Sequence, residues 1–227
     1  MKCFALLDAL AAEPGPAGVS ALARRTGSVR GTTYQHLQTL VAAGWVEPVG
    51  GGKYRLTLRA MLVGNAVLEQ ADLGSRIMPT LTSLAGRTSE TSSLAVLDDD
   101  AATIIQRVAA DRALKVDIKA GTRMPLEPSA SGRVLVAFCS EEELDRVRAS
   151  GVPMPKPEVI EQVRSLSYAS QHDEYFPGMS SIAVPIHPTK LGLVALAITA
   201  PSARYGEAAA LEALRAGAGE VAQILGS

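Results

Sequence analysis

Glycine and proline divide the first 57 residues into segments so short that only small helices and a hairpin fit between them. From Phe4 onward, apolar side chains recur every three or four residues until Pro14, and this spacing predicts a first helix. The apolar face of this helix is predicted to carry Phe4, Leu7, Leu10 and Ala11.

Two further helices are predicted before residue 45. Ser20 stands where an N-cap would open a short helix, and Gly27 suits the left-handed turn that would close it. A third helix is predicted over residues 30–43, with Gly44 at its C-terminus. Its buried side is predicted to carry Thr33, His36, Leu37, Leu40 and Val41.

A two-stranded hairpin is predicted after the third helix. Residues 45–49 and 53–56 flank the run Gly50-Gly51-Gly52, which favours a tight turn. Three helices followed by such a hairpin are typical of winged helix-turn-helix domains. Lys53 and Arg55 on the hairpin could reach phosphate groups or the minor groove of DNA.

The opposite side of the third helix is polar, and amide or hydroxyl groups there can read base edges in DNA. A solvated helix surface would look similar, but the wing and the charge distribution favour DNA. Residues 1–60 carry seven basic and three acidic side chains, whereas the rest of the chain carries 15 basic and 20 acidic ones. The candidate DNA contacts are Ser20, Arg30, Thr32, Tyr34, Gln35, Gln38, Lys53 and Arg55.

Residues 58–75 predict a linker helix whose apolar surface is wider than a single stripe. Such a surface has to be buried against the chain's own body or against a second copy. The apolar positions are Leu58, Met61, Leu62, Ala66 and Leu68.

The remaining residues mix helical and strand patterns, which predicts an α+β domain over residues 76–227. The predicted strands are 93–97, 103–108, 114–118, 182–186 and 193–199, the first two joined by an Asp98-Asp99-Asp100 turn. The predicted helices are 77–87, one that opens at Ser129-Ala130-Ser131-Gly132, and a long alanine-rich one at the end of the chain.

Composition excludes several other classes of protein. With 47% hydrophobic residues in 227, the chain is not disordered, and no apolar run approaches the roughly 18 residues of a membrane helix. No secretion signal opens the chain, so a cytoplasmic protein is expected. Cys3 and Cys139 belong to no metal-ligand spacing, and His172-Asp173-Glu174 has no distant partner ligand, so neither a metal nor another cofactor is expected.

An enzyme is not expected either, because the chain has three histidines and no hydrolase or nucleotide-binding motif. One hydrolase alternative stays open, a triad of Ser131, His172 and Asp173, which would require these three residues to meet in space.

Taken together, these segments resemble the IclR family of bacterial transcriptional regulators over nearly the whole chain. The resemblance rests on residues 22–27, 37–46 and 53–56, then on Glu90-Thr91, 121–126, 131–135, Glu174, Gly178 and 182–185. It implies a winged helix-turn-helix over residues 1–57, a linker helix over 58–75, and a GAF-like domain with an antiparallel sheet over 76–227.

The resemblance also implies the partners. They are operator DNA, a small-molecule effector in the C-terminal domain, and a second copy in a homodimer or a dimer of dimers, with no membrane contact. The family usually has Arg where this chain has Gln35, and Ser where it has Gly31. The alternative that these departures suggest is a ligand-binding and oligomerisation module with weakened DNA binding.

The family's effector pocket, carried over position by position, begins at a helix start whose free N–H groups can bind a carboxylate or carbonyl. It falls on Val116, Met124, Ala130, Ser131, Gln171, Met179, Ser181, Ala197 and Thr199. Gln171 replaces a common acidic residue, Ser181 a frequent Cys, and Ala197 a Ser. These departures imply a larger or less charged ligand than the small keto acids that some relatives bind. An alternative reading is that the Met and Val side chains are simply core.

Overall fold

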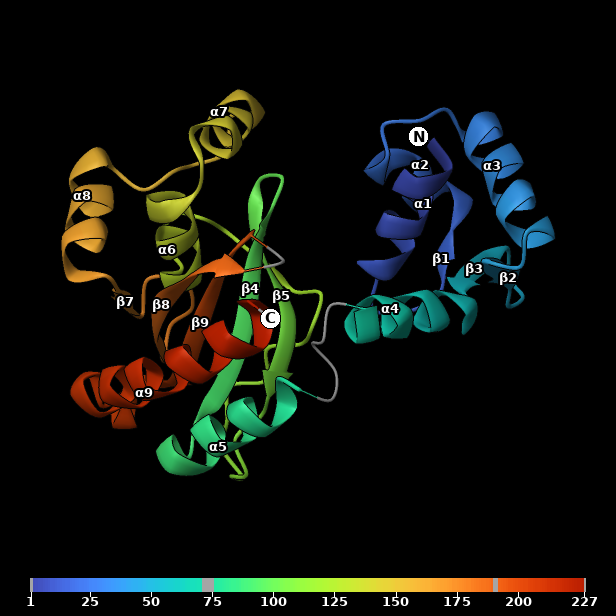
Figure 1. Cartoon of the computed structure of the whole chain (residues 1–227). Coiled ribbons are helices and arrows are strands. Elements are labelled where there is room, and N and C mark those ends of the chain that lie inside the picture. Colours follow the sequence, from blue (N-terminus) through green and yellow to red (C-terminus); the bar gives the residue numbers. More distant parts are fainter. Residues whose placement is uncertain (1, 71–75, 190–191, 227) are drawn as a thin grey trace. The chain divides into compact units, whose positions relative to one another are not determined.

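The computed structural model describes residues 2–70, 76–189 and 192–226. The chain forms two compact units, Met1–Leu68 and Glu69–Ser227, and each is considered by itself (Figure 1).

Three helices, a small sheet and most of a fourth helix make up the described part of the N-terminal unit. The elements are α1 (Lys2–Ala11), β1 (Ala17–Gly18), α2 (Val19–Arg25), α3 (Arg30–Ala42), β2 (Val46–Pro48), β3 (Lys53–Leu56) and α4 (Arg59–Gln70). The sheet order is β1-β3-β2, with all pairs antiparallel. A single apolar core, centred on Leu6, Leu22 and Leu37, joins the helices to Tyr54 of the wing. The predicted helix-turn-helix and hairpin are therefore confirmed.

Glycine makes two of the turns possible. Gly27, after α2, has φ +61°, and Gly44, after α3, has φ +76°, a backbone region that side chains disfavour. The chain reverses at each, as the sequence predicts, which places α3 across α2 and starts the wing.

Two local predictions for this unit are wrong. Of the predicted face of α1, Leu10 is buried and Leu7 packs against the core, but Phe4 is 70% exposed and Ala11 is exposed. Leu6 and Ala9 are buried in their place, because the helix is apolar on more than one side and tertiary packing selects the face. Ser20 is not an N-cap, because α2 begins at Val19 with Gly18 in the cap position and has no side-chain cap.

The C-terminal unit is a six-stranded antiparallel sheet covered by helices. The strands are β4 (Thr91–Asp98), β5 (Ala101–Val108), β6 (Arg123–Met124), β7 (Ala169–His172), β8 (Met179–Thr189) and β9 (Gly192–Pro201), in the order β6-β5-β4-β9-β8-β7. The helices are α5 (Met78–Thr88), α6 (Ala130–Phe138), α7 (Glu141–Ser150), α8 (Pro157–Leu166), α9 (Glu207–Gly226) and a 3-10 turn, Ser202–Arg204. Within the described ranges, no helix is long and apolar enough to cross a membrane.

Strand alternation gives the sheet two different faces. Ser92 of β4 donates to the carbonyl of Leu81 in α5, at 2.7 Å, so the even-numbered residues of β4 face α5 and α9. Ala95, Ala183 and Ala197 share a buried cluster with α6, so the odd-numbered residues of β4, β8 and β9 face α6. Figure 1 shows α5 and α9 together on one side of the sheet.

One predicted strand does not form. Residues 114–118 alternate strictly in sequence, but the structure has no regular secondary structure from 115 to 119; Lys115 and Asp117 point to solvent while the segment runs over the sheet without joining it. The hairpin of β4 and β5, the strands β8 and β9, and the helices α5, α6 and α9 are confirmed. Residues 71–75 of the predicted linker, and Lys190, lie outside the described residues.

Candidate DNA-binding and effector sites

A groove of about 700 Å³ lies between α2, the start of α3 and the wing turn. It brings together three predicted DNA contacts that are separate in sequence, Ser20, Arg30 and Tyr34. All three side chains are exposed, with Tyr34 at 50%. A concave surface with a cation, a hydroxyl and a phenol matches the shape and charge of a sugar-phosphate backbone.

The outward side of α3 carries the predicted base contacts. Gln35 is exposed, whereas Thr32 is half-buried. Gln38 is exposed too, but its Nε2 donates to the Tyr54 hydroxyl of β3 at 3.2 Å. Gln35 is thus the amide on this helix that is open to a base edge, and Gln38 also links the helix to the wing.

The two basic residues of the wing, Lys53 and Arg55, differ in whether an acidic side chain pairs with them. Arg55 donates from Nε to Glu47 Oε1 at 2.6 Å, across the β2–β3 pair. Lys53 is exposed, and no ion pair is found for it in the part of the chain that the structure describes. An unpaired ammonium binds phosphate without first breaking a contact, so Lys53 is the stronger candidate of the two.

The start of α4 is fixed to the N-terminal unit. The Thr57 hydroxyl donates to the Gly44 carbonyl at 2.6 Å, and Arg59 Nη1 donates to the Ala43 carbonyl at 2.8 Å. The Arg59 guanidinium also lies 5.4 Å from the Trp45 ring centroid. The direction of α4 is therefore set by the end of α3.

Most of the apolar side chains of α4 are exposed. The exposed fractions are 61% for Met61, 69% for Leu62, 49% for Val63 and 54% for Val67, and Leu58 just before the helix is 81% exposed. Exposed apolar side chains grouped along one helix indicate a surface that another molecule covers.

In the C-terminal unit, strand register aligns three predicted effector residues. Gln171 on β7 pairs with Ser181 on β8, which pairs with Thr199 on β9. Thr199 in turn pairs with Thr91 on β4, a polar residue that sequence analysis missed. The row of polar side chains is buried on the face of the sheet that packs against α6.

The other predicted effector residues surround the same face. Ala197 lies two residues from Thr199 on the same face and pairs with Ala183. Met124, Ala130 and Met179 belong to the buried cluster between α6 and the sheet, and Val116 packs against it. The structure therefore brings the nine predicted effector residues to one region of the domain, although they come from six different segments.

The start of α6 has the geometry of an anion or carbonyl anchor. Ser129 is the N-cap, and its Oγ accepts from the Gly132 amide at 3.0 Å while donating to the Pro125 carbonyl at 2.6 Å. The amides of Ala130 and Ser131, the first two of the helix, have no partner within the helix. Both residues are at most 3% exposed.

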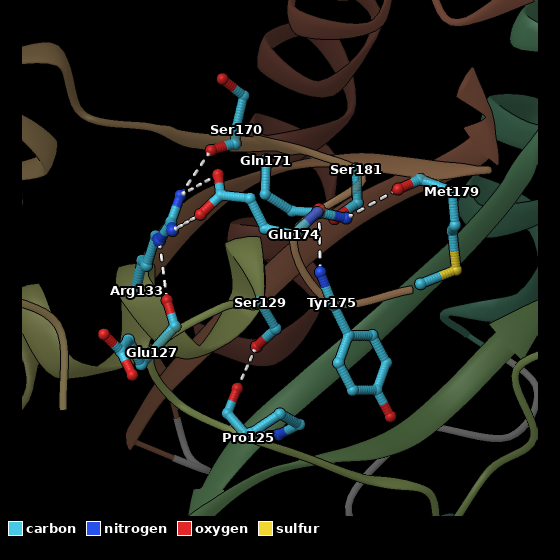
Figure 2. A network of polar contacts seen from close by, with 10 residues as sticks. All are labelled: Pro125, Glu127, Ser129, Arg133, Ser170, Gln171, Glu174, Tyr175, Met179 and Ser181. Atoms are coloured by element: carbon cyan, nitrogen blue, oxygen red, sulfur yellow. Dashed lines mark hydrogen bonds and ion pairs between the residues drawn. The ribbon is translucent and has the colours of Figure 1, made fainter. Parts of the chain in front are cut away.

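Gln171 makes four side-chain hydrogen bonds within the chain, and Figure 2 shows it among these partners. Its Nε2 donates to the Met179 carbonyl at 3.3 Å and to Ser181 Oγ at 3.1 Å. Its Oε1 accepts from the amides of Glu174 at 3.0 Å and Tyr175 at 3.4 Å. Gln171 therefore organises the β7–β8 loop, residues 173–178.

Arg133 joins α6 to the same loop. Its guanidinium donates to the carbonyls of Glu127 at 2.8 Å and Ser170 at 3.0 Å, and it binds both carboxylate oxygens of Glu174. Its side chain is only 14% exposed. Arg133 and Glu174 carry the family resemblance in the sequence, but their pairing could not be read from their spacing.

The hydrolase alternative is contradicted by the sheet. His172 pairs with Glu207 of α9, Nε2 to Oε2 at 3.2 Å, so it lies on the α9 side, whereas Ser131 is buried in α6 on the opposite side. Asp173 Oδ1 instead accepts from the Ser202 hydroxyl at 2.5 Å, and this hydrogen bond lowers the pKa of Asp173.

The Cys139 thiol is not activated. It is partly buried, and burial raises its pKa to about 11, so little of it is thiolate at neutral pH.

Comparisons with known proteins agree with the two-part architecture. Residues 1–50 match the IclR helix-turn-helix domain, and residues 65–223 match the C-terminal domain of bacterial IclR transcriptional regulators. The HTH-type transcriptional regulator KdgR of Escherichia coli is 30% identical over 221 residues, which cover 91% of this chain and 83% of KdgR.

Solved structures show the same fold. An IclR transcriptional regulator from Silicibacter sp. superposes with a TM-score of 0.85 at 24% identity, covering 100% of this chain and 95% of that one. An IclR homologue from Microbacterium hydrocarbonoxydans, complexed with 4-hydroxybenzoate, gives a TM-score of 0.78 at 21% identity and covers 99% and 97%. The chain belongs to the IclR family of bacterial transcriptional regulators, with a helix-turn-helix domain that binds DNA and a C-terminal domain that binds an effector.

Proposed function

We propose that the chain acts in the cytoplasm as a homodimer, or a dimer of dimers, that binds an operator through residues 1–57 and changes its affinity when an effector binds within residues 76–227. The observation that carries the proposal is the combination of a groove at α2, α3 and the wing, lined by Arg30, Ser20 and Tyr34, with an exposed apolar surface on α4. Residues 58–75 would connect the two functions.

DNA contacts are proposed in two classes. Ser20, Arg30, Tyr34, Lys53 and Arg55 would bind phosphate or sugar, which fixes the position of the head on the duplex without reading sequence. Thr32, Gln35 and Gln38 would face the major groove, where an amide can bind adenine through two hydrogen bonds.

The two classes make different predictions on an operator selected from the organism's genome. Gln35→Ala is expected to weaken the binding free energy on the operator by about 1–3 kcal/mol, the range typical of a base contact, and to relax the preference at one base position. Lys53→Ala is expected to weaken operator and scrambled duplex alike. Gln162→Ala, on an exposed face of α8, serves as the matched control for both.

Dimerisation is proposed through α4. Because Thr57 and Arg59 fix the helix to α3, pairing two α4 helices would also set the separation of the two recognition helices. Two half-sites about one helical turn apart could then be read together, which a single small head cannot do.

The effector is proposed to bind between α6 and the polar row of the sheet. The amides of Ala130 and Ser131 and the hydroxyls of Ser181 and Thr199 would bind its polar group, and Val116, Met124, Met179 and Ala197 would contact its apolar part. None of these side chains is charged, which favours a predominantly apolar ligand. Gln171 would contribute by shaping the loop beside the ligand.

Calorimetry with the full chain tests this ligand class. Aromatic acids are a first set of compounds, since the Microbacterium relative holds 4-hydroxybenzoate. Thr199→Val should weaken any ligand found, whereas Thr82→Val, on the exposed side of α5, should not. Tight binding of glyoxylate or pyruvate would contradict the proposed class.

A further inference from the structure

The β7–β8 loop, residues 173–178, is held by hydrogen bonds near its start and at its end. The Glu174 and Tyr175 amides donate to Gln171, and the Gly178 amide donates to Asp173 Oδ1 at 2.8 Å. Near its start, the loop is also held to α6 by the Glu174 carboxylate, which pairs with Arg133 (Figure 2).

The Arg133–Glu174 pair differs from an ordinary surface ion pair. The Arg133 side chain is 14% exposed and donates to four oxygens, two backbone carbonyls and the two carboxylate oxygens. Bidentate, charge-assisted bonds are stronger and more directional than neutral ones. A mostly buried guanidinium that loses its carboxylate is left with an uncompensated charge, so the pair opens only at a cost.

This loop covers part of the proposed effector site. Tyr175 packs against the cluster between α6 and the sheet, and Met179, at the end of the loop, belongs to that cluster. The candidate residues on the sheet and on α6 are at most 7% exposed. A ligand can therefore reach them only after a covering segment moves.

Besides α6 and the loop 173–178, the irregular stretch of residues 109–118 also covers part of this face of the sheet. It is held differently from the loop, because Thr91 donates to the Val116 carbonyl at 2.9 Å and Arg204 donates to the Leu114 carbonyl at 2.7 Å.

The loop 173–178 is held to α6 by the Arg133–Glu174 ion pair and by the packing of Tyr175. It is also held to the 3-10 turn by Ser202, whose hydroxyl donates to Asp173 at 2.5 Å and whose amide donates to the Gly178 carbonyl at 2.9 Å. The ion pair is the charged contact that must break before the loop can move away from α6.

We infer that Arg133 and Glu174 are positioning residues, whose ion pair holds the loop 173–178 closed over the effector site and sets how often that site opens. The inference rests on the proposed location of the site. Neither residue needs to touch the ligand. Weakening the Arg133–Glu174 pair raises the rate at which the loop opens. A bound effector that pushes the loop outward would also raise that rate.

Thiol labelling tests this without an effector. In a chain carrying Cys3→Ser and Cys139→Ala, Ala197→Cys places one thiol on the floor of the site, where iodoacetamide reacts only in the open state. Glu174→Gln is expected to raise the labelling rate about tenfold, the effect typical of losing one charge-assisted contact. Glu142→Gln is the matched control, because it makes the same change in a side chain that is 85% exposed, paired with Arg146 at 3.8 Å, and it should leave the rate unchanged.

Hydrogen exchange supplies a second readout in a chain with no added cysteine. Glu174→Gln should speed the exchange of amides in residues 173–179, while the denaturant midpoint of the whole domain stays close to that of the parent. Labelling and exchange at parental rates would overturn the inference. The inference would also be overturned if Thr91→Val speeded the labelling of the Ala197→Cys thiol and Glu174→Gln did not, because the reagent would then enter beneath residues 109–118. These rates do not depend on DNA or on an effector, so failure of the proposed function would be seen separately in the binding experiments.

Discussion

Gly132, at the start of α6 where we propose that the effector binds, has no room for a single added carbon. A Cβ there would lie 2.5 Å from the Leu126 Cα and carbonyl oxygen and 2.7 Å from Ser129 Oγ. Carbon atoms in contact normally lie about 3.5–4.0 Å apart, so Gly132→Ala must push α6 away from the backbone of the preceding segment by about 1 Å.

The size of the effect follows from three contributions. Overpacking costs about 1–3 kcal/mol, and separating the Gly132 amide from the Ser129 cap costs about 1 kcal/mol more. The better helix propensity of alanine returns about 1 kcal/mol. The net loss is about 2 kcal/mol, which corresponds to a fall of about 4–8 °C in melting temperature for a domain of this size.

Thermal unfolding followed by circular dichroism measures this loss. Gly219→Ala in α9 is the matched control, because the added Cβ there meets nothing within 4 Å, and it should leave the melting temperature unchanged or raise it. A Gly132→Ala chain as stable as the parent would refute the account of how the start of α6 is built.

Three further predictions concern other parts of the chain. Burial raises the pKa of Cys139 to about 11. At pH 8, Cys139 should therefore be alkylated at least tenfold more slowly than an unperturbed cysteine with a pKa of about 8.5, and its rate should rise as the pH approaches 11. Rapid alkylation at pH 8, measured by mass spectrometry, would contradict this. Ser140→Ala removes the capping box of α7 and should cost about 1 kcal/mol in urea unfolding. Hydrogen bonds from the Ser140 amide and hydroxyl lower the pKa of Glu143, and Ser140→Ala removes the hydroxyl's contribution. That contribution is present above the ordinary glutamate pKa and is lost as pH falls through the lowered value, so the difference between parent and variant should narrow in acid. It should not vanish, because the Glu143 amide still donates to Ser140 Oγ in the parent. Met61→Glu should shift the chain toward monomer in sedimentation, whereas Glu161→Gln on α8 should not.

The helix-turn-helix could be predicted from sequence because local signals agree there. Gly27 and Gly44 stop helices where a positive φ is needed, and the apolar positions of α3 fit a single face. Part of the face of α1 was predicted wrongly, since Phe4 and Leu6 both fit a helical period with Leu10, and only packing against the rest of the unit distinguishes them. β1, with two residues, is too short to carry a pattern.

In the C-terminal domain, the strands with long alternating or apolar runs were predicted and the rest were not. Residues 114–118 alternate like a strand yet have no neighbouring strand to pair with, which alternation cannot reveal. The sequence does hold signals for α7 and α8, the Ser140 and Glu143 box and Pro157 after Lys156. The pairing of Arg133 with Glu174 spans 41 residues and depends on strand register, so only the fold shows it.

The most direct test of the regulator account is fluorescence anisotropy of the full chain on DNA fragments selected from its own genome, compared with scrambled duplexes over a salt series. The account predicts specific binding that weakens steeply with salt, with a slope that falls by about 0.9 in Lys53→Ala as one phosphate contact is lost. Equal, weak binding to selected and scrambled duplexes, with the same slope in Lys53→Ala, would contradict it.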